Sequence, residues 1–220
     1  MILESIPVGP FQCNCVILGD EATREAVVVD PGDDLDRICE ILDHYRLNVT
    51  KTVHTHGHLD HIGASGLLRL ERGALAHIHG SDLPLWRAYP GQAALFGLPA
   101  RDLPDPDVLL KEGDRIRAGS IVLEVIATPG HTPGSVCLAL RTERESSGEP
   151  LLFSGDTLFR QGIGRTDLWG GDYRTIMASL RERLFTLPED TIVHPGHGPL
   201  TSIHDEKRSN PFIADIRSIK

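Results

Sequence analysis

Short apolar runs separated by turn-forming residues recur along the chain and predict a series of β-strands. The runs at residues 13–19 and 26–30 are the clearest, with Gly19, Asp20 and Glu21 in the turn between them. Further strands are expected at residues 49–54, 74–79, 115–117, 120–127, 134–140, 150–154 and 190–194. Several neighbouring runs are separated only by short turns, which favours hairpin connections between them.

Between the strands, apolar residues at three- and four-residue spacing predict helices. One helix is expected over residues 35–46, where Asp33 or Asp34 can cap the first turn. Other helices are expected over residues 61–72, over 173–185 after a capping Asp172, and after residue 203. Interleaved strands and helices with hairpin links predict a mixed sheet, or a pair of sheets, covered by helices.

The order of these elements indicates one compact domain over residues 1–220. A segment at about 81–106 differs from the rest, because it is rich in proline and also holds Trp86, Tyr89 and Phe96. We interpret this segment as an insertion of short helices and loops rather than as a linker. Residues from about 203 to 220 are expected to form a short C-terminal helical appendage.

Composition and charge exclude several classes of protein. Of 220 residues, 40% are hydrophobic and 24% are charged, which is typical of a globular chain and not of a disordered one. The net charge of −9 disfavours nucleic acid and anionic membranes as partners. The chain has no apolar run of about 20 residues, no signal-peptide pattern and only four cysteines. We therefore expect a cytoplasmic protein.

A histidine-rich segment after the strand at 49–54 carries the strongest chemical signal. Within six residues it holds four groups that bind zinc, iron or manganese in proteins: His56, His58, Asp60 and His61. One histidine alone at this place would be interpreted as a solvent-facing residue at a helix cap. Four such groups so close together indicate a metal site instead.

Three more residues of ligand type lie where later strands end. His131 is in T-P-G-H-T, Asp156 is in F-S-G-D-T and His197 is in V-H-P-G-H-G. Loops at one edge of a sheet can bring together residues that are far apart in the sequence. We therefore expect these residues to join the histidine-rich segment in one site.

The motifs T-H-G-H-L-D-H, G-H-T, G-D-T and P-G-H-G together resemble those of the metallo-β-lactamase superfamily. V-D-P-G at residues 29–32 resembles an early strand-end motif of the same superfamily. The resemblance covers nearly the whole chain. It implies an α/β fold of the αβ/βα sandwich type, with two mixed β-sheets face to face, helices on the outer faces and metals at one sheet edge.

Within the superfamily the chain looks most like glyoxalase II, the hydroxyacylglutathione hydrolases, and their short bacterial relatives. That resemblance implies two divalent metal ions, with zinc expected first and iron or manganese as alternatives. It assigns His56, His58 and His131 to the first ion, Asp60, His61 and His197 to the second, and Asp156 to both. Asp60 is also assigned a catalytic role, as a ligand that can orient the nucleophile. Asp30 is expected to orient a ligand rather than to bind metal.

The implied reaction is hydrolysis of a small-molecule thioester, S-D-lactoylglutathione or a related hydroxyacyl-glutathione. A hydroxide that bridges the two ions is the expected nucleophile. Arg165 is the candidate contact for a substrate carboxylate. An ion pair between Arg165 and Asp167 that stiffens the loop is an equal alternative. Residues 206–212 resemble the start of the glyoxalase II C-terminal region, and the short continuation to Lys220 makes glutathione specificity less secure than hydrolysis.

An oxidoreductase of the same superfamily is the main alternative. Persulfide dioxygenases use a single iron, which here would be held by His56, His131 and Asp156 and would act on glutathione persulfide. The segment Gly164-Arg165-Thr166-Asp167 also resembles that family. A nucleic-acid phosphodiesterase, an exported β-lactamase and a metal-binding protein without catalysis are less favoured. Retention of all seven ligand positions favours two metals.

Overall fold

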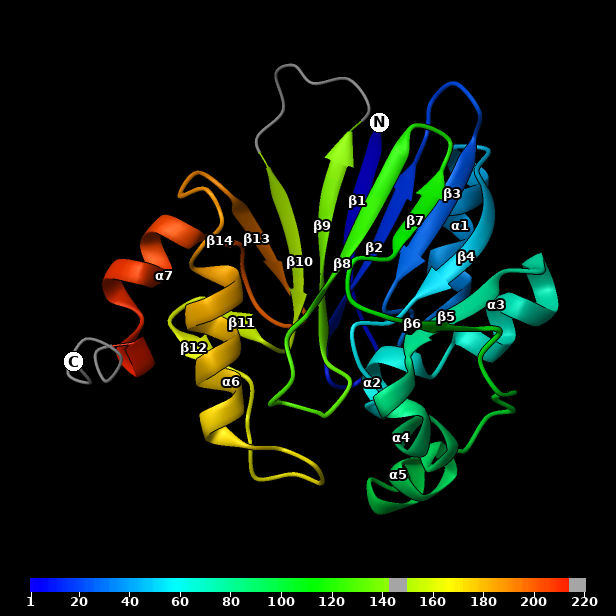
Figure 1. Cartoon of the computed structure of the whole chain (residues 1–220). Helices are drawn as coiled ribbons and strands as arrows, with labels where there is room; N and C mark the ends of the chain where they lie inside the picture. The colour runs from blue at the N-terminus through cyan, green and yellow to red at the C-terminus, as the bar shows by residue number, and fades with distance from the viewer. Residues whose placement is uncertain (143–149, 214–220) are drawn as a thin grey trace.

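Two β-sheets face each other and helices cover both outer faces, as Figure 1 shows. The computed structural model describes residues 1–142 and 150–213 of the chain. Its layers are those of the αβ/βα sandwich, so the predicted fold class is confirmed. Within the described part of the chain, no helix combines the length and apolar character needed to cross a membrane.

The first sheet has the order β1-β2-β3-β4-β5-β6. Its strands are β1 (Ile2–Val8), β2 (Cys13–Gly19), β3 (Glu25–Val29), β4 (Asn48–Val53), β5 (Leu75–His79) and β6 (Val108–Leu110). The pairs β1–β2 and β2–β3 are antiparallel, and the strands from β3 to β6 are parallel. Parallel neighbours need crossover connections, which α1 (Leu35–His44) and α3 (Ser65–Arg72) provide on the outer face.

The second sheet has the order β14-β13-β10-β9-β8-β7. Its strands are β7 (Arg115–Ala118), β8 (Ile121–Ala127), β9 (Val136–Thr142), β10 (Leu151–Gly155), β13 (Ile192–Pro195) and β14 (Thr201–Ser202). The pair β10–β13 is parallel and the other neighbouring pairs are antiparallel. Helices α6 (Tyr173–Ser179) and α7 (Ile203–Ser209) cover its outer side, near the small hairpin of β11 (Leu158–Phe159) and β12 (Gly162–Ile163).

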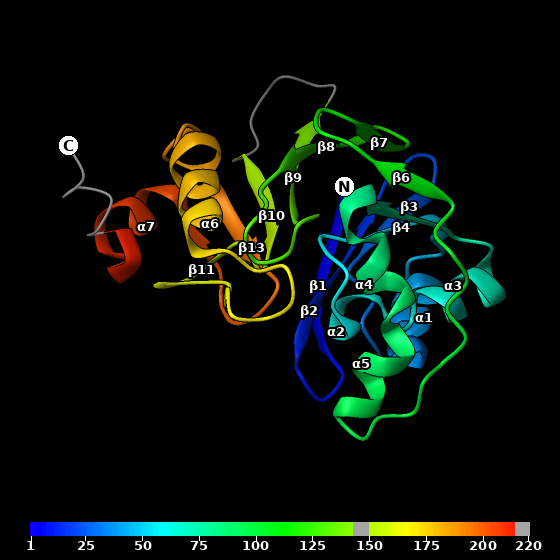
Figure 2. The same ribbon diagram turned by 60° about the horizontal axis from the view of Figure 1, so that its bottom comes forward.

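The remaining helices gather at one end of the sandwich, as the rotated view in Figure 2 shows. They are α2 (Leu59–Ile62), α4 (Leu83–Arg87) and α5 (Tyr89–Leu95). A 3-10 turn at Gly80–Asp82 leads from β5 into α4, and another follows α7 at Pro211–Ile213. The segment at 81–106 therefore packs as short helices and loop beside the first sheet.

Apolar side chains fill three layers between and outside the sheets. On β3, Val27 and Val29 point into the layer between the sheets, where Phe153 of β10 is also buried. Ala26 and Val28 point the other way and pack against α1. A strand that is buried on both faces needs apolar residues at every position, which is why this strand is a continuous apolar run rather than an alternating one.

Several expected elements differ in the structure. The edge strand β1 was not predicted; Pro7 lies within it, and an edge strand tolerates proline. The expected helix at 61–72 is two helices, α2 and α3, because Ala64 donates its backbone N–H to the Pro31 carbonyl (2.9 Å) at the break. Asp34 precedes α1 in a left-handed conformation, but its carboxylate accepts from Gly9 N–H instead of capping the helix.

Other expectations agree with the structure or lie outside it. Asp172 caps α6 as expected, since its carboxylate accepts from Thr175 N–H (2.7 Å). The helix expected over 173–185 changes after Ser179 into a wider π-helical turn over Leu180–Leu184. The short strands β6, β11, β12 and β14 were also not predicted. The expected turn at 142–149 falls outside the described residues from 143 on, and the end of the C-terminal appendage, 214–220, also falls outside them.

Candidate metal centre

Four loops at one edge of the sandwich bring the seven candidate ligands together. His56 and His58 are in the loop after β4, and Asp60 and His61 follow directly in α2. The other three ligands, His131, Asp156 and His197, lie in the loops that follow β8, β10 and β13. Since β8, β10 and β13 run in the same direction, their ends meet at one edge, opposite the end of β4.

The first group of ligands is a triangle of imidazole nitrogens. His56 Nε2 lies 3.0 Å from His58 Nδ1 and 3.2 Å from His131 Nε2, and His131 Nε2 lies 2.9 Å from His58 Nδ1. Three nitrogens on a tetrahedral zinc ion with ordinary bond lengths would be about 3.3 Å apart. The three atoms are therefore spaced as a metal ion would require.

The second group combines imidazole nitrogens with carboxylate oxygens. Asp60 Oδ2 lies 3.2 Å from His197 Nε2 and 3.7 Å from His61 Nε2. The carboxylate of Asp156 lies between the groups: Oδ1 is 3.4 Å from His61 Nε2, and Oδ2 is 3.6 Å from His131 Nε2. Asp156 is thus within reach of both groups.

Two buried polar atoms show that these residues fit a cation. In the described part of the chain, His61 Nε2 and Asp156 Oδ1 have no hydrogen-bond partner. A buried polar atom without a partner costs about 1–3 kcal/mol, and more when the group is charged. The two atoms lie 3.4 Å apart, and Asp60 Oδ2 lies 3.7 Å from His61 Nε2, so a divalent ion among these residues would satisfy them.

Contacts behind the ligands select the nitrogen that faces the site. The Asp30 carboxylate accepts hydrogen bonds from Thr55 N–H (2.8 Å) and Thr55 Oγ1 (2.7 Å), and its Oδ2 lies 3.0 Å from His61 Nδ1. The backbone carbonyl of Arg165 lies 2.8 Å from His131 Nδ1. Each acceptor draws the ring proton to Nδ1 and leaves Nε2 free to bind metal. The role of the Arg165 carbonyl was not foreseen, since a backbone contact leaves no residue-type signal.

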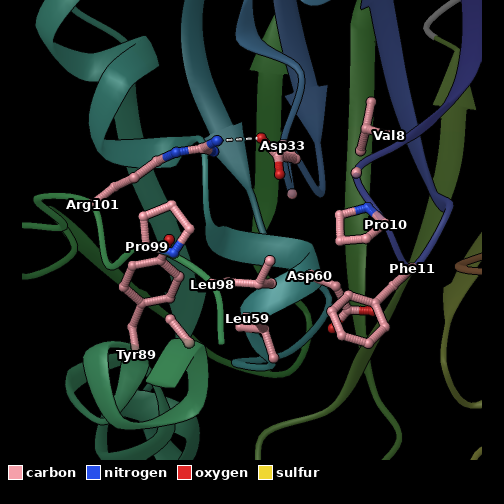
Figure 3. Close-up of a pocket in the computed structure, with 13 residues that line it drawn as sticks. Val8, Pro10, Phe11, Asp33, Leu59, Asp60, Tyr89, Leu98, Pro99 and Arg101 are labelled. Carbon is pink, nitrogen blue, oxygen red and sulfur yellow. Dashed lines mark ion pairs between the residues drawn. The ribbon is translucent and has the colours of Figure 1, made fainter. Parts of the chain in front are cut away.

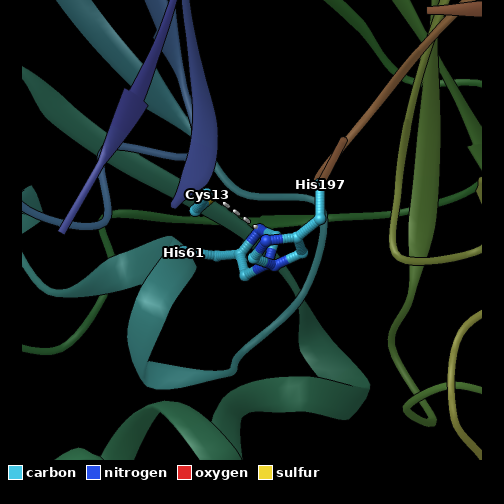
Figure 4. A group of neighbouring side chains, drawn as sticks. All are labelled: Cys13, His61 and His197. Carbon is cyan, nitrogen blue, oxygen red and sulfur yellow. Dashed lines mark hydrogen bonds between the residues drawn. The ribbon is translucent and has the colours of Figure 1, made fainter. Parts of the chain in front are cut away.

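A cysteine lies beside the second group, as Figure 4 shows. Cys13 Sγ is 3.5 Å from His61 Nδ1, on the edge of the ring that faces away from His61 Nε2. Burial raises the pKa of the Cys13 thiol to about 12. The neutral thiol therefore packs behind His61, as small apolar cysteines do in protein cores.

The family is shown by a profile match that includes all seven candidate ligands. Residues 8–197 match the profile of the family described as "Metallo-beta-lactamase superfamily". The chain belongs to the metallo-β-lactamase superfamily.

Relatives in the superfamily carry several different names. The chain is 40% identical over 217 residues to hydroxyacylglutathione hydrolase GloC of Haemophilus influenzae, covering 97% of this chain and 98% of that protein. It is 33% identical over 210 residues to the human mitochondrial persulfide dioxygenase ETHE1, covering 93% of this chain and 73% of that protein.

Solved structures of superfamily members overlay closely on the chain. The BLEG-1 B3 metallo-β-lactamase has a TM-score of 0.85 and 38% identity, covering 96% of this chain and 99% of that one. A di-iron-bound form of TTHA1623 has a TM-score of 0.82 and 36% identity, covering 95% and 99% of the two chains. The relatives share a fold, while their names span hydrolases and an oxygenase.

Charge is distributed differently over the two ligand groups of this superfamily member. Burial and the neighbouring imidazoles lower the pKa of His58 to about 3, and burial also lowers the pKa of His56 and His131. Burial opposes the charged form of His61 too, but the carboxylates of Asp156, Asp60 and Asp30 raise its pKa overall. The first group therefore consists of neutral imidazoles. In the second group a protonated histidine lies among carboxylates, and a metal ion can take the place of its proton.

Arg165 lies on an exposed loop at the rim of the site. Its guanidinium makes two hydrogen bonds of 2.8 Å to the Asp167 carboxylate, and 60% of its side chain is exposed. Its positive charge is close enough to help lower the pKa of His58. The ion pair that was expected as one alternative is present.

A small cavity adjoins Asp60, as Figure 3 shows. Phe11, Leu59, Tyr89 and Leu98 are among its lining side chains, and its volume is about 40 Å³. The ion pair between Arg101 and Asp33 stands at one end of it. Phe11 is held in place by an edge-to-face contact with Phe96, with ring centroids 5.0 Å apart.

Proposed function

We propose that the protein is a dinuclear metal-dependent hydrolase that cleaves a thioester, S-D-lactoylglutathione or a related hydroxyacyl-glutathione. The observation that carries the proposal is the position of Asp156, whose two oxygens reach one nitrogen of each ligand group. A carboxylate shared in this way is typical of a site for two ions. The 40% identity to a protein named hydroxyacylglutathione hydrolase supports the choice of substrate.

The residues divide between two ions. His56, His58 and His131 would hold one, and Asp60, His61 and His197 would hold the other, with Asp156 between them. Bound divalent ions supply a water that is acidic enough to lose a proton near neutral pH, and they polarise the carbonyl oxygen of the substrate.

Asp60 has a second task at this site. Burial alone would raise its pKa, but His61 and the hydrogen bond from His197 hold the pKa below its usual range, so the carboxylate is ionised. An anionic carboxylate next to the attacking water accepts one of its protons in a hydrogen bond and so orients the water's lone pair. A thiolate is a weak base and leaves without a proton from the protein.

Arg165 is the proposed contact for a carboxylate of the substrate. The guanidinium of Arg165 can exchange its bonds to Asp167 for bidentate bonds to a glutathione carboxylate. Because both partners are exposed, the pair itself contributes little to stability, and the exchange costs little free energy.

The test combines metal analysis with turnover in one sample. Wild-type protein should hold two ions per chain and hydrolyse S-D-lactoylglutathione, and Asp156→Asn should lose an ion and at least about 100-fold in kcat/KM. The matched control is Asp20→Asn, which alters another buried carboxylate at the far end of β2 from the site. Protein with both ions and no thioester turnover, or with turnover of a β-lactam only, would overturn the proposal.

A second candidate is a single-iron persulfide dioxygenase, because the chain also resembles human ETHE1. That reaction would use His56, His131 and Asp156, which lie together in the first part of the site. The variant His197→Ala separates the two functions. A hydrolase that needs both ions should lose its activity, whereas an oxygenase should keep one iron and continue to consume oxygen with glutathione persulfide.

A further inference from the structure

Asp82 is a buried acid outside the seven candidate ligands. It is the last residue of the 3-10 turn after β5, and its side chain is fully buried. One oxygen, Oδ2, accepts from Gly57 N–H (2.8 Å) and from Thr132 Oγ1 (2.7 Å). The other oxygen, Oδ1, accepts from Gly134 N–H (2.6 Å). All three donors belong to loops that carry metal ligands.

These three bonds join two loops from opposite sheets. Gly57 stands between His56 and His58 in the loop after β4, and Thr132 follows His131 in the loop after β8. Elsewhere in the described chain, the backbone bond from Val136 N–H to Thr55 carbonyl (2.8 Å) also joins them. Asp82 is therefore a bridge beside the histidines, and it comes from a third segment of the chain.

Glycines at two of these positions allow the close approach. A Cβ atom on Gly134 would lie 2.7 Å from the Asp82 carboxylate, and one on Gly57 would lie 3.2 Å from the Asp82 carbonyl. Real Cβ atoms rarely come so near to other atoms. Gly134 thus leaves room for the carboxylate of Asp82, and Gly57 leaves room for its backbone.

We propose that Asp82 is a positioning residue that sets the separation of His56 and His58 from His131, and so determines the affinity of the first metal ion. The inference rests on the proposed metal centre. A histidine triangle with sides of 2.9–3.2 Å tolerates little movement of one loop against the other. Partners behind metal ligands typically contribute 10–100-fold to metal affinity.

Substitution by asparagine disrupts the bridge at nearly constant volume. An amide has one acceptor oxygen, which can take the place of Oδ2 or of Oδ1 but not of both. Its NH2 group then faces either Gly134 N–H or Gly57 N–H, and the repulsion between the two donors displaces that loop. Thr132→Val removes the hydroxyl, and with it the bonds to Asp82 and Ser135, but keeps the negative charge of Asp82. Thr132→Ser keeps the hydroxyl, so the two variants together separate positioning from simple electrostatic attraction.

The measurement is a titration of metal-free protein with Zn²⁺ against a chromophoric chelator, with melting temperatures recorded on the same samples. The titration is repeated in a His197→Ala background, in which the second group is incomplete and the first ion is observed alone. The matched control is Asp20→Asn, which alters a buried carboxylate that accepts from Ala22 and Thr23 N–H far from the site.

Asp82→Asn should lower the affinity for the first zinc ion by about 10–100-fold and leave the affinity for the second ion unchanged. Thr132→Val should lower the affinity for the first ion by a smaller factor, and Thr132→Ser should leave that affinity unchanged. Asp20→Asn should lower the melting temperature without changing either affinity. Wild-type protein that binds no zinc would overturn the metal centre itself. If the wild-type protein binds two ions and Asp82→Asn binds both with the wild-type affinities, only the role of Asp82 is overturned. If Asp82→Asn does not fold, an unchanged affinity for the first ion in Thr132→Val overturns the role of Asp82.

Discussion

The substitution Asp30→Asn tests how the second ion is held. The Asp30 carboxylate is buried, receives two hydrogen bonds from Thr55 and faces His61 Nδ1 at 3.0 Å. In the variant the amide oxygen can keep the Thr55 N–H bond, which leaves the NH2 group opposite His61 Nδ1. An imidazole that accepts at Nδ1 carries its proton on Nε2, the atom that would bind metal.

The magnitude follows from the bond that is lost. A hydrogen bond to a charged group contributes about 1.5–3 kcal/mol. Each 1.4 kcal/mol is about tenfold in a binding constant. The second ion should therefore bind about 10–100-fold more weakly in Asp30→Asn. The first ion should be affected less, because Asp30 is linked to the histidine triangle only through Thr55 Oγ1, which lies 3.1 Å from His56 Nδ1.

The assay is the two-site zinc titration of metal-free protein. The matched control is Asp33→Asn, which alters a neighbouring carboxylate that pairs with Arg101 and does not contact a candidate ligand. Asp30→Asn and Asp82→Asn should show opposite patterns, with the second ion weakened in one and the first ion weakened in the other. An Asp30→Asn protein that binds the second ion with the wild-type affinity would refute the idea that this carboxylate selects the His61 tautomer.

Three further predictions follow from the packing and the pKa values. Gly196→Ala should lose the second ion by metal analysis, because its Cβ would lie 2.3 Å from Asp156 Oδ1, whereas Gly91→Ala, with open space around it, should keep both ions. Phe153→Ala should lower the free energy of unfolding in urea by about 3–5 kcal/mol, since the ring is buried between the sheets; a loss below 1 kcal/mol would contradict this. Burial lowers the pKa of His77 below its usual 6.5, so the unfolded chain binds the proton first and stability should fall as the pH drops below about 6.5. His77→Gln should make that decline shallower in urea unfolding between pH 7 and 5, because it removes one of the buried histidines with a lowered pKa; an unchanged slope would show that His77 does not contribute to it.

Local patterns predicted much of the fold. The strand at residues 13–19 is found with the same bounds, and the helix after Asp172 begins where its cap predicts. Both depend on neighbours in the sequence: apolar side chains that suit a pleat, and a carboxylate that satisfies a free N–H. The break between α2 and α3 was not predictable in this way, because the bond from Ala64 to Pro31 joins residues far apart in the chain.

The sequence by itself determined which groups could bind metal. Four of them lie within residues 56–61, and the other three follow strands in recognisable motifs, because their side-chain chemistry is carried by residue type. Only the tertiary structure decided how these groups are held. The bridge from Asp82, the Arg165 carbonyl behind His131 and the thiol behind His61 are contacts across 25–52 residues of sequence. Such contacts depend on where the two sheets place their loop ends, and a backbone carbonyl or one buried acid looks like any other until the chain has folded.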